Sequence, residues 1–453
     1  MDSGRPVVAD ARACAGFPAL DALASEAELR AWVDVIDTHS PNRSGDAEHD
    51  AYVDWLANRM TDATGVEPTV VRHAIDDRAI DGASLEVVAG GTTFDVPLAG
   101  PIPRTAFTDG VTLPLVYAPE PVSSPPVDRL LVRELPIGAI PADGLVSAAH
   151  FIHDPDGFLE DVLAPGARVQ RPWMSGPIQN ELRQLSAQGR TPGVIWLRTE
   201  AGPMVDGIWV QSSLLGFPSV MLAAPEASRL RTHLMEDDIA SATLIVRGRD
   251  EALEARSLVF EVPGERGLLV VETHTDTLNA VQENGGAAMI ALARWYAARP
   301  RACRPWTLRF ELAAAHRSGL LGAIDARERA TRDGAVGVLT FEHLGAREYV
   351  ATPGGVEATG ALELTALSLP AALDANSVKE RVESRGVRAV IALPEGLGRF
   401  GEAKVFADTI PTAELISGPW IQNSPNAGPE AIDFEDMRAE LGLLADLLLM
   451  WSP

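Results

Sequence analysis

The sequence predicts an α/β protein whose main domain is interrupted by a β-rich segment, and three observations lead to this fold class. An apolar strand of the buried type, Leu268–His274, is followed by a long apolar helix pattern, as in a sheet covered by helices. Two amphipathic helix patterns open the chain and another closes it. Between residues 107 and 248 the sequence changes to short apolar strands separated by Pro and Gly.

The helices are predicted from their apolar spacing and their caps. The first spans residues 25–37 and begins with a capping box, in which its first residue is paired with Glu28. Residues 41–45, which include Pro and Gly, separate it from a second helix over residues 46–60. The last helix spans residues 433–450, begins with an aspartate as N-cap and places an apolar stripe against the core.

The strands are shorter and are predicted from apolar runs between turn residues. A strand at residues 69–73 follows the first two helices. In the β-rich segment we expect a helix from Pro225 to Met235 and strands at residues 113–117, 130–133, 193–197 and 243–246. After the strand that ends at His274, further strands are expected at residues 308–312, 339–342, 362–365, 387–393 and 413–416.

Composition and charge restrict the functions that are possible. With 453 residues, 46% of them hydrophobic and 22% charged, the chain is long enough for two or three globular domains. A net charge of -25 disfavours binding to nucleic acid, which requires clustered Lys and Arg. No run of about 18 apolar residues is present, so we expect no membrane span.

The cysteines and the N-terminus bear on the compartment. Cys14 and Cys303 are the only two cysteines, and we expect neither a disulfide framework nor a thiolate zinc site from them. The first ten residues lack the apolar core of a signal peptide. A cytoplasmic location is therefore favoured, although secretion stays open if the sequence has been trimmed.

The strongest chemical signal is the pair His274 and Asp276 at the end of an apolar strand. Ligands of open α/β sheets bind at the carboxyl ends of the strands, where this imidazole and carboxylate would lie. Four other candidates follow in the same half of the chain: Glu283, His316, Glu342 and His343. The six remaining histidines are expected to be mostly solvated: His39, His49, His73, His150, His153 and His233.

The order of these motifs resembles that of the zinc exopeptidases of the bacterial leucyl aminopeptidase type. The resemblance includes His274-Thr-Asp276, the helix ending Leu292-Ala-Arg294, the sequence Gly319-Leu-Leu-Gly322, and Glu342 after the next strand. It implies a mixed-sheet, three-layer α/β domain formed by residues 18–106 and 249–453. It also implies that the β-rich segment, residues 107–248, is an inserted protease-associated domain of the kind that acts as a lid or substrate filter.

Compared with that family, the ligand set is degraded. His274 and Asp276 match the first ligand and the carboxylate that orients it. The family's bridging Asp corresponds to Val281, with Glu283 as the nearest carboxylate, and its Glu-Glu pair corresponds to His316 and Arg317. Its later Asp corresponds to Glu342, and the segment 422–426, where its last His belongs, contains no histidine.

These departures favour one metal ion rather than two. We expect one divalent metal, with zinc as the expected ion, held by ligands from His274, Glu283, Glu342 and His343. His316 is expected to be either a third ligand or the general base, because an imidazole titrates close to neutral pH. Asp276 and Glu283 are expected to assist catalysis. An arginine such as Arg317 at a ligand position repels a cation.

Each candidate also has a purely structural interpretation. Glu283 would be a carboxylate that complements the positive end of a helix dipole. Glu342 and His343 would be a polar strand end, with one side chain in the sheet and one in solvent. His316 would be a hydrogen-bonded turn residue.

Three functions remain open at this point. The first is a metal-dependent hydrolase of a peptide or other amide substrate, the second a non-catalytic binding protein with the same fold, and the third a scaffold used for another reaction. Nucleotide binding is disfavoured, because Gly285-Gly286 has neither a P-loop lysine nor a Gly-x-Gly-x-x-Gly pattern. A serine nucleophile is disfavoured because no Gly-x-Ser-x-Gly is present.

Overall fold

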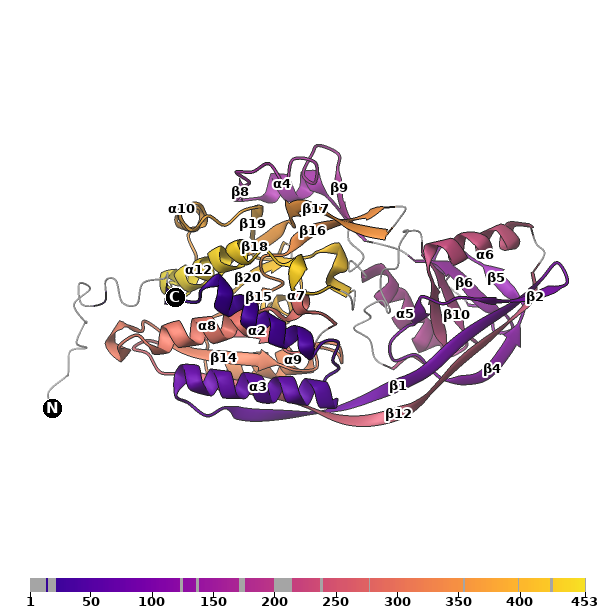
Figure 1. The fold of residues 1–453 in the computed structure, drawn as a ribbon, viewed down its shortest axis with the longest axis horizontal. Helices are drawn as coiled ribbons and strands as arrows, with labels where there is room; N and C mark the ends of the chain where they lie inside the picture. The colour runs from indigo at the N-terminus through magenta and orange to yellow at the C-terminus, as the bar shows by residue number, and fades with distance from the viewer. Residues whose placement is uncertain are drawn as a thin grey trace.

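The structure is a computed structural model, and it describes most of the chain. The residues described are 14, 22–122, 125–135, 138–170, 176–198, 214–236, 239–276, 278–352, 355–397, 399–423 and 427–452. They form a main body and a smaller lobe, which are joined by two long strands (Figure 1).

The main body is built on a mixed sheet with eleven strands of described residues, in the order β2-β1-β12-β14-β13-β15-β20-β18-β19-β8, with β4 paired to β12. Its central strands β14, β13, β15 and β20 are parallel, whereas β12 and β18 run antiparallel to their neighbours β14 and β20. The strands are β1 Thr69–Ala89, β2 Thr92–Val96, β4 Thr108–Leu113, β8 Phe151–His153, β12 Ile239–Val262, β13 Leu268–His274, β14 Thr307–Ala313, β15 Gly337–Glu342, β18 Thr365–Leu369, β19 Val390–Pro394 and β20 Thr412–Ser417.

Helices cover both faces of this sheet, which gives three layers. One face carries α2 Glu26–Thr38, α3 Ala47–Thr64, α8 Gly285–Ala297, α10 Ala375–Arg385 and α12 Phe434–Met450, whose apolar side chains share one large core. The other carries α9 Leu321–Arg332 and the short α11 Ala403–Phe406, which pack on Val270 and Val338. This arrangement confirms the predicted mixed-sheet, three-layer α/β class.

The helix caps agree with the sequence. Ser25 and Glu28 form the predicted capping box at the start of α2. Asp46 caps α3, and Asp433 caps α12 by accepting from the backbone N–H of Asp436. These caps satisfy N–H groups that have no partner within the helix.

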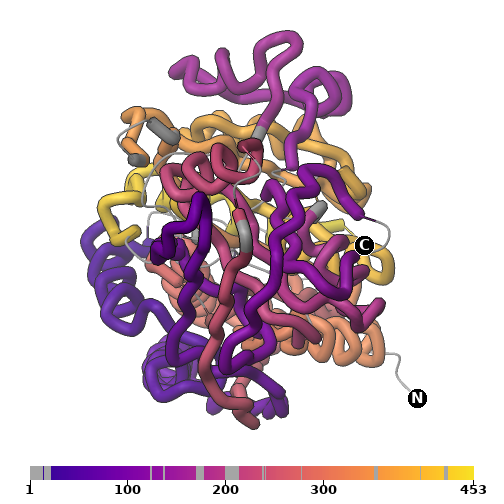
Figure 2. Tube along the Cα trace, turned by 90° about the vertical axis from the view of Figure 1, so that its right-hand side faces the viewer, coloured from indigo at the N-terminus to yellow at the C-terminus, as the bar shows by residue number. Residues whose placement is uncertain are grey.

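The smaller lobe has its own sheet, in the order β3-β11-β10-β6-β5. Its strands are β3 Gly100–Pro101, β5 Leu115–Tyr117, β6 Leu130–Glu134, β10 Val194–Leu197 and β11 Ser219–Leu222, and its helices are α5 Gly176–Gln188 and α6 Ala224–Glu236. In Figure 2, which looks onto this lobe, the far halves of β1 and β12 run alongside it. An apolar core lies on each side of this sheet, and one of the two cores includes side chains of β1, β2 and β12.

The segment 138–170 belongs to the main body although it falls within residues 107–248. Strand β8 pairs antiparallel with β19 at the edge of the large sheet. The helix α4 Ala142–Ala148 and the pair β7 Ala139–Pro141 and β9 Arg168–Gln170 lie next to it (Figure 1). The chain therefore leaves the lobe once and returns before α5. A further hairpin, β16 Arg347–Thr352 and β17 Gly355–Leu362, follows the strand β15.

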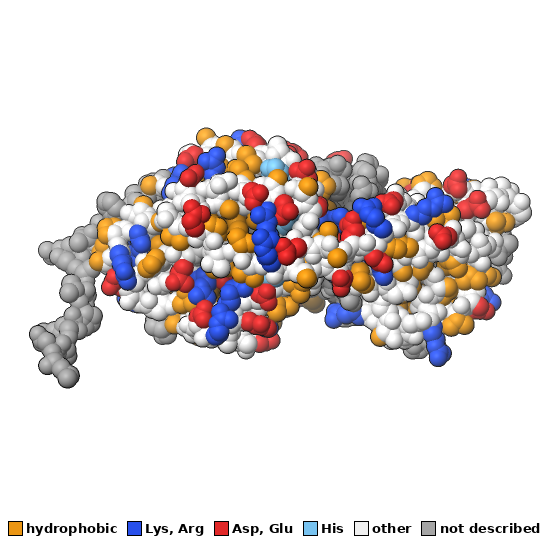
Figure 3. Space-filling view, turned by 90° about the horizontal axis from the view of Figure 1, so that it is seen from below, with side chains coloured by type: hydrophobic (Ala, Val, Ile, Leu, Met, Phe, Trp, Pro, Cys, Tyr) orange, Lys and Arg blue, Asp and Glu red, His pale blue; other side chains and the backbone are white. Residues whose placement is uncertain are grey.

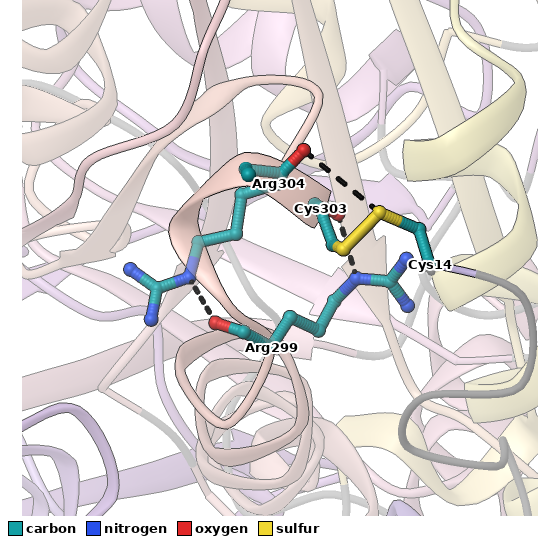
Figure 4. The surroundings of a disulfide bond; sticks show 5 residues. Cys14, Arg299, Cys303 and Arg304 are labelled. Atoms are coloured by element: carbon teal, nitrogen blue, oxygen red, sulfur yellow. Dashed lines mark hydrogen bonds between the residues drawn. A yellow bond between two sulfur atoms is a disulfide. The ribbon is translucent and has the colours of Figure 1, made fainter. Parts of the chain in front are cut away.

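Cys14 and Cys303 form a disulfide, which we did not expect from the sequence (Figure 4). Cys303 ends the 3-10 turn η2 Arg301–Cys303 that follows α8. The Arg299 side chain donates to the carbonyl oxygen of Cys303 at 3.0 Å and stabilises this turn. The partners are 289 residues apart, so spacing alone gave no indication of the pairing.

Charges on the surface are mixed. On the face drawn in Figure 3, lysine and arginine side chains are interspersed with acidic ones and do not gather into one basic patch. Among the described residues, no helix combines the length and apolar character needed to cross a bilayer.

Candidate metal centre

The candidate residues meet at the carboxyl ends of the parallel strands β13, β14 and β15. His274 is the last residue of β13 and Glu342 the last of β15, and His316 lies three residues after β14. All three side chains are buried. Neighbouring parallel strands end at one edge of a sheet, so strand order brings together residues that are far apart in sequence.

His274, Glu342 and His343 form a compact group. Oε2 of Glu342 lies 3.4 Å from Nε2 of His274 and 3.5 Å from Nε2 of His343. One ligand atom from each residue lies within 4.8 Å of the others, and within the described part of the chain this is the only such group of three His, Cys, Asp or Glu side chains. Two imidazoles and one carboxylate are a ligand set that holds zinc in hydrolases.

The backbone at His343 explains how two consecutive residues face one point. Successive side chains of a strand point to opposite faces. His343 adopts φ 57°, a left-handed conformation that is costly for a residue with a Cβ and that ends the strand at Glu342. The turn brings both side chains to the same site.

The nitrogen atoms of the two histidines fit a metal. The Nδ1 atom of His343 lies 2.7 Å from the carbonyl oxygen of Ser417, which only accepts, so Nδ1 carries the proton and the lone pair is on Nε2. Nε2 of His343 and both ring nitrogens of His274 are buried and make no hydrogen bond with any described residue. Buried polar atoms are normally satisfied, and metal coordination would satisfy Nε2 of each ring.

The electrostatics of the group couple His274 to Glu342. Burial opposes a charged imidazole, but the contact with Glu342 outweighs it and raises the pKa of His274 to about 9. Burial likewise opposes a charged carboxylate, yet His274 lowers the pKa of Glu342. Without a metal, the two residues therefore form a buried ion pair at neutral pH.

Asp276 has a different partner from the one expected. Its two carboxylate oxygens accept from the backbone N–H groups of His316 at 3.0 Å and Arg317 at 3.2 Å. Nδ1 of His274 makes no hydrogen bond within the described residues, so the expectation that Asp276 orients this ring was wrong. Asp276 instead fixes the turn that carries His316.

Glu283, at the end of α7 Ala280–Glu283, is buried but lies outside the group of three. Burial and the charge of Asp276 raise its pKa well above the usual value, and Arg317 and the Asn42 side chain oppose this shift. Burial and the charge of Glu283 also raise the pKa of the Tyr52 hydroxyl well above its usual value. The structure therefore groups Glu283 with Asp276 and Arg317.

The guanidinium of Arg317 is a positive charge close to Asp276 and Glu283. Its Nη2 donates to Oε1 of Gln282 at 2.9 Å. Burial lowers its pKa to about 10, against the opposing influence of Asp276 and Glu283, so the guanidinium is charged at neutral pH. Asp276 and Glu283 thus already have a positive charge beside them.

His316 lies against His274. Its ring centroid is 4.3 Å from that of His274, at an interplanar angle of 39°. Its Nδ1 lies 3.0 Å from Oε1 of the buried Glu402. The preceding Ala315 has φ 63°, a second strained position next to the site.

Several neighbours of the site were not predicted from the sequence. His49, expected to be solvated, is buried and its Nε2 lies 3.0 Å from Oγ1 of Thr275. Glu402, Glu272 and Glu414 are buried carboxyl groups around His316 and Glu342. In the sequence, Glu272 and Glu414 were notable only as charged residues within apolar strands. No sequence pattern indicated that Glu402 lies near the site.

Gly285 and Gly286 pack closely at the start of α8. A Cβ at Gly285 would overlap Oγ1 of Thr273, and one at Gly286 would overlap the hydroxyl of Tyr52. Because these two residues have no side chain, α8 can pack closely against the sheet at Thr273 and against α3 at Tyr52. The last part of segment 422–426, residues 424–426, lies outside the described residues.

Comparison with known proteins gives a fold but no sequence relative. No protein-family model and no curated protein matches the chain. Among solved structures, an aminopeptidase from Aneurinibacillus sp. strain AM-1 superimposes with a TM-score of 0.65, covering 96% of this chain and 95% of that one at 14% identity. The chain has the aminopeptidase fold.

Two further aminopeptidase-fold structures agree. A zinc aminopeptidase from Bacillus subtilis matches with a TM-score of 0.65, 14% identity and coverage of 93% of this chain and 95% of that one. A peptidase M28 precursor from Shewanella amazonensis matches with a TM-score of 0.61, 14% identity and 95% coverage of both chains. At this identity the likeness establishes the fold, and any activity has to be argued from the site.

Proposed function

We propose that the protein is a metal-dependent hydrolase of peptide or other amide bonds that uses one divalent ion, with zinc as the expected ion. The ligands would be His274, Glu342 and His343. The observation that carries the proposal is this group of two imidazoles and one carboxylate at the sheet edge of an aminopeptidase fold.

The side chains divide the chemistry between them. A divalent cation bound at such a site supplies Lewis acidity, which polarises a carbonyl group and makes water easier to deprotonate. His316, in contact with His274, would take the proton at Nε2 and return it to the leaving amine. Asp276 would hold His316 in place through the backbone of the turn.

Glu283 lies outside the proposed ligand set, and the charges beside it favour a single ion. The charged guanidinium of Arg317 lies with Asp276, Glu283 and Gln282, so a second cation there would meet electrostatic repulsion. Arg317 corresponds to a ligand Glu in the zinc exopeptidases that the sequence resembles. This difference also supports the alternative, a non-catalytic binding protein.

A substrate panel separates these functions. Purified protein supplied with zinc, manganese or iron is expected to release amine from aminoacyl amides, short peptides or simple amides, and a chelator is expected to stop the reaction. Glu342→Gln, which removes the charge of one ligand, is the matched inactive variant. Metal binding without turnover on the whole panel would favour the binding protein, or a different reaction.

The disulfide favours an oxidising compartment over the cytoplasmic location expected from the sequence, because structural disulfides are rare in the cytosol. Protein purified from its native source without reductant is expected to show no free thiol when denatured, and two thiols per chain after reduction, as the two cysteines require. Two free thiols before reduction would contradict this location.

A further inference from the structure

The buried contact between His316 and Glu402 links the proposed base to a residue distant in sequence. The two are 86 residues apart, and Nδ1 of His316 lies 3.0 Å from Oε1 of Glu402. Glu402 is 0% and His316 4% exposed, so water does not compete for this contact. A hydrogen bond in such an environment is stronger and more directional than one at the surface.

Glu402 is held in place independently of His316. Its backbone N–H donates to Oε1 of Glu342 at 3.0 Å. The preceding Gly401 has φ 44°, and a Cβ there would overlap the carboxylate of Glu342, so only glycine permits this approach. Helix α11 follows at once and buries Phe406 against the sheet. The same framework therefore fixes both Glu402 and the ligand Glu342.

We infer that Glu402 is the positioning residue for His316: its Oε1 accepts the Nδ1 proton and thereby fixes both the ring orientation and the tautomer with the lone pair on Nε2. This inference rests on the proposed function, in which His316 moves the proton. Glu402 itself touches no reacting atom. An imidazole without such an acceptor can carry its proton on either nitrogen, and the form protonated on Nε2 cannot act as a base from that atom.

The kinetic test compares Glu402→Leu with Glu414→Gln, because leucine offers no acceptor to Nδ1 of His316, whereas the carbonyl of a glutamine still would. Glu414 is a buried carboxyl group on strand β20 whose Oε2 accepts from the backbone N–H of Phe400, which makes it a control for a change at a buried carboxyl group nearby. Glu402→Leu is expected to lower kcat by roughly 10- to 10²-fold, the usual cost of losing a residue that orients an active-site side chain, with KM and metal content unchanged. Glu414→Gln is expected to keep most of the activity, and Glu402→Asp, which retains an acceptor, to recover part of it.

A spectroscopic test does not depend on activity. In metal-free protein labelled with ¹⁵N on its 9 histidines, the ring signals of His316 are assigned by their loss in His316→Asn. We expect neutral His316 to be protonated on Nδ1 in the wild type, and to lose this preference in Glu402→Leu, which offers Nδ1 no acceptor. A wild-type ring protonated on Nε2, or a ring unaffected by Glu402→Leu, would overturn the inference even if no substrate is found. The expected tautomers without any turnover would instead count against the proposed function alone.

Discussion

Replacing His274 with alanine is expected to abolish metal retention while the protein stays folded. Purification without chelator should give about one ion per chain for the wild type, as one set of three ligands permits, and close to none for the variant. The fold should survive because Glu342, which loses its buried ion-pair partner, can take up a proton. Elemental analysis together with circular dichroism measures both outcomes.

A matched control and a pH series sharpen this experiment. His150→Ala removes an exposed histidine and should leave the metal content unchanged. Because the pKa of free His274 is raised to about 9, binding at neutral pH must displace its proton, so the metal affinity should rise about tenfold per pH unit and level off above that pKa. A variant that keeps its metal would remove His274 from the site.

Replacing His316 with asparagine is expected to remove most of the activity without removing the metal. Loss of a general base lowers kcat by about 10²- to 10⁴-fold. The metal should remain, since His316 lies outside the group formed by His274, Glu342 and His343. KM should change little, because the proton moves only in the transition state.

Two results would show that His316 is not the general base. Loss of both metal and activity in His316→Asn would make it a ligand, the alternative left open by the sequence. Full activity would identify it as a structural residue of the turn that Asp276 holds.

Local signals in the sequence predicted much of the fold. The capping box of Ser25 and the aspartate cap at residue 433 placed the first and last helices, because capping depends on a few adjacent residues. The strand ending at His274 was evident from its unbroken apolar run, which is typical of a buried parallel strand.

The long hairpin was the main omission from the fold. Strands β1 and β12 contain 21 and 24 residues, whereas the sequence predicted only short pieces at residues 69–73 and 243–246. Charged residues in their middle had the appearance of loops. In the structure these charges are paired across the strands, as in the contact of Arg78 with Asp250 at 3.0 Å, and no local pattern shows such pairing.

The sequence predicted only part of the candidate site. His274, Glu342 and His343 stand at predicted strand ends, so strand order was enough to bring them together. Asp276 was given the wrong partner, because a spacing of two residues does not show which way a side chain points. Glu402 precedes a helix of 4 residues and meets His316 only through the tertiary fold, so no sequence pattern marked it.

The proposed single-metal centre is tested most directly by a crystal structure of zinc-loaded protein with anomalous data collected at the zinc edge. One anomalous peak is expected, within bonding distance of Nε2 of His274, the carboxylate of Glu342 and Nε2 of His343. A peak elsewhere, a second peak beside Asp276 and Glu283, or no peak at full zinc loading would contradict the proposed single-metal centre.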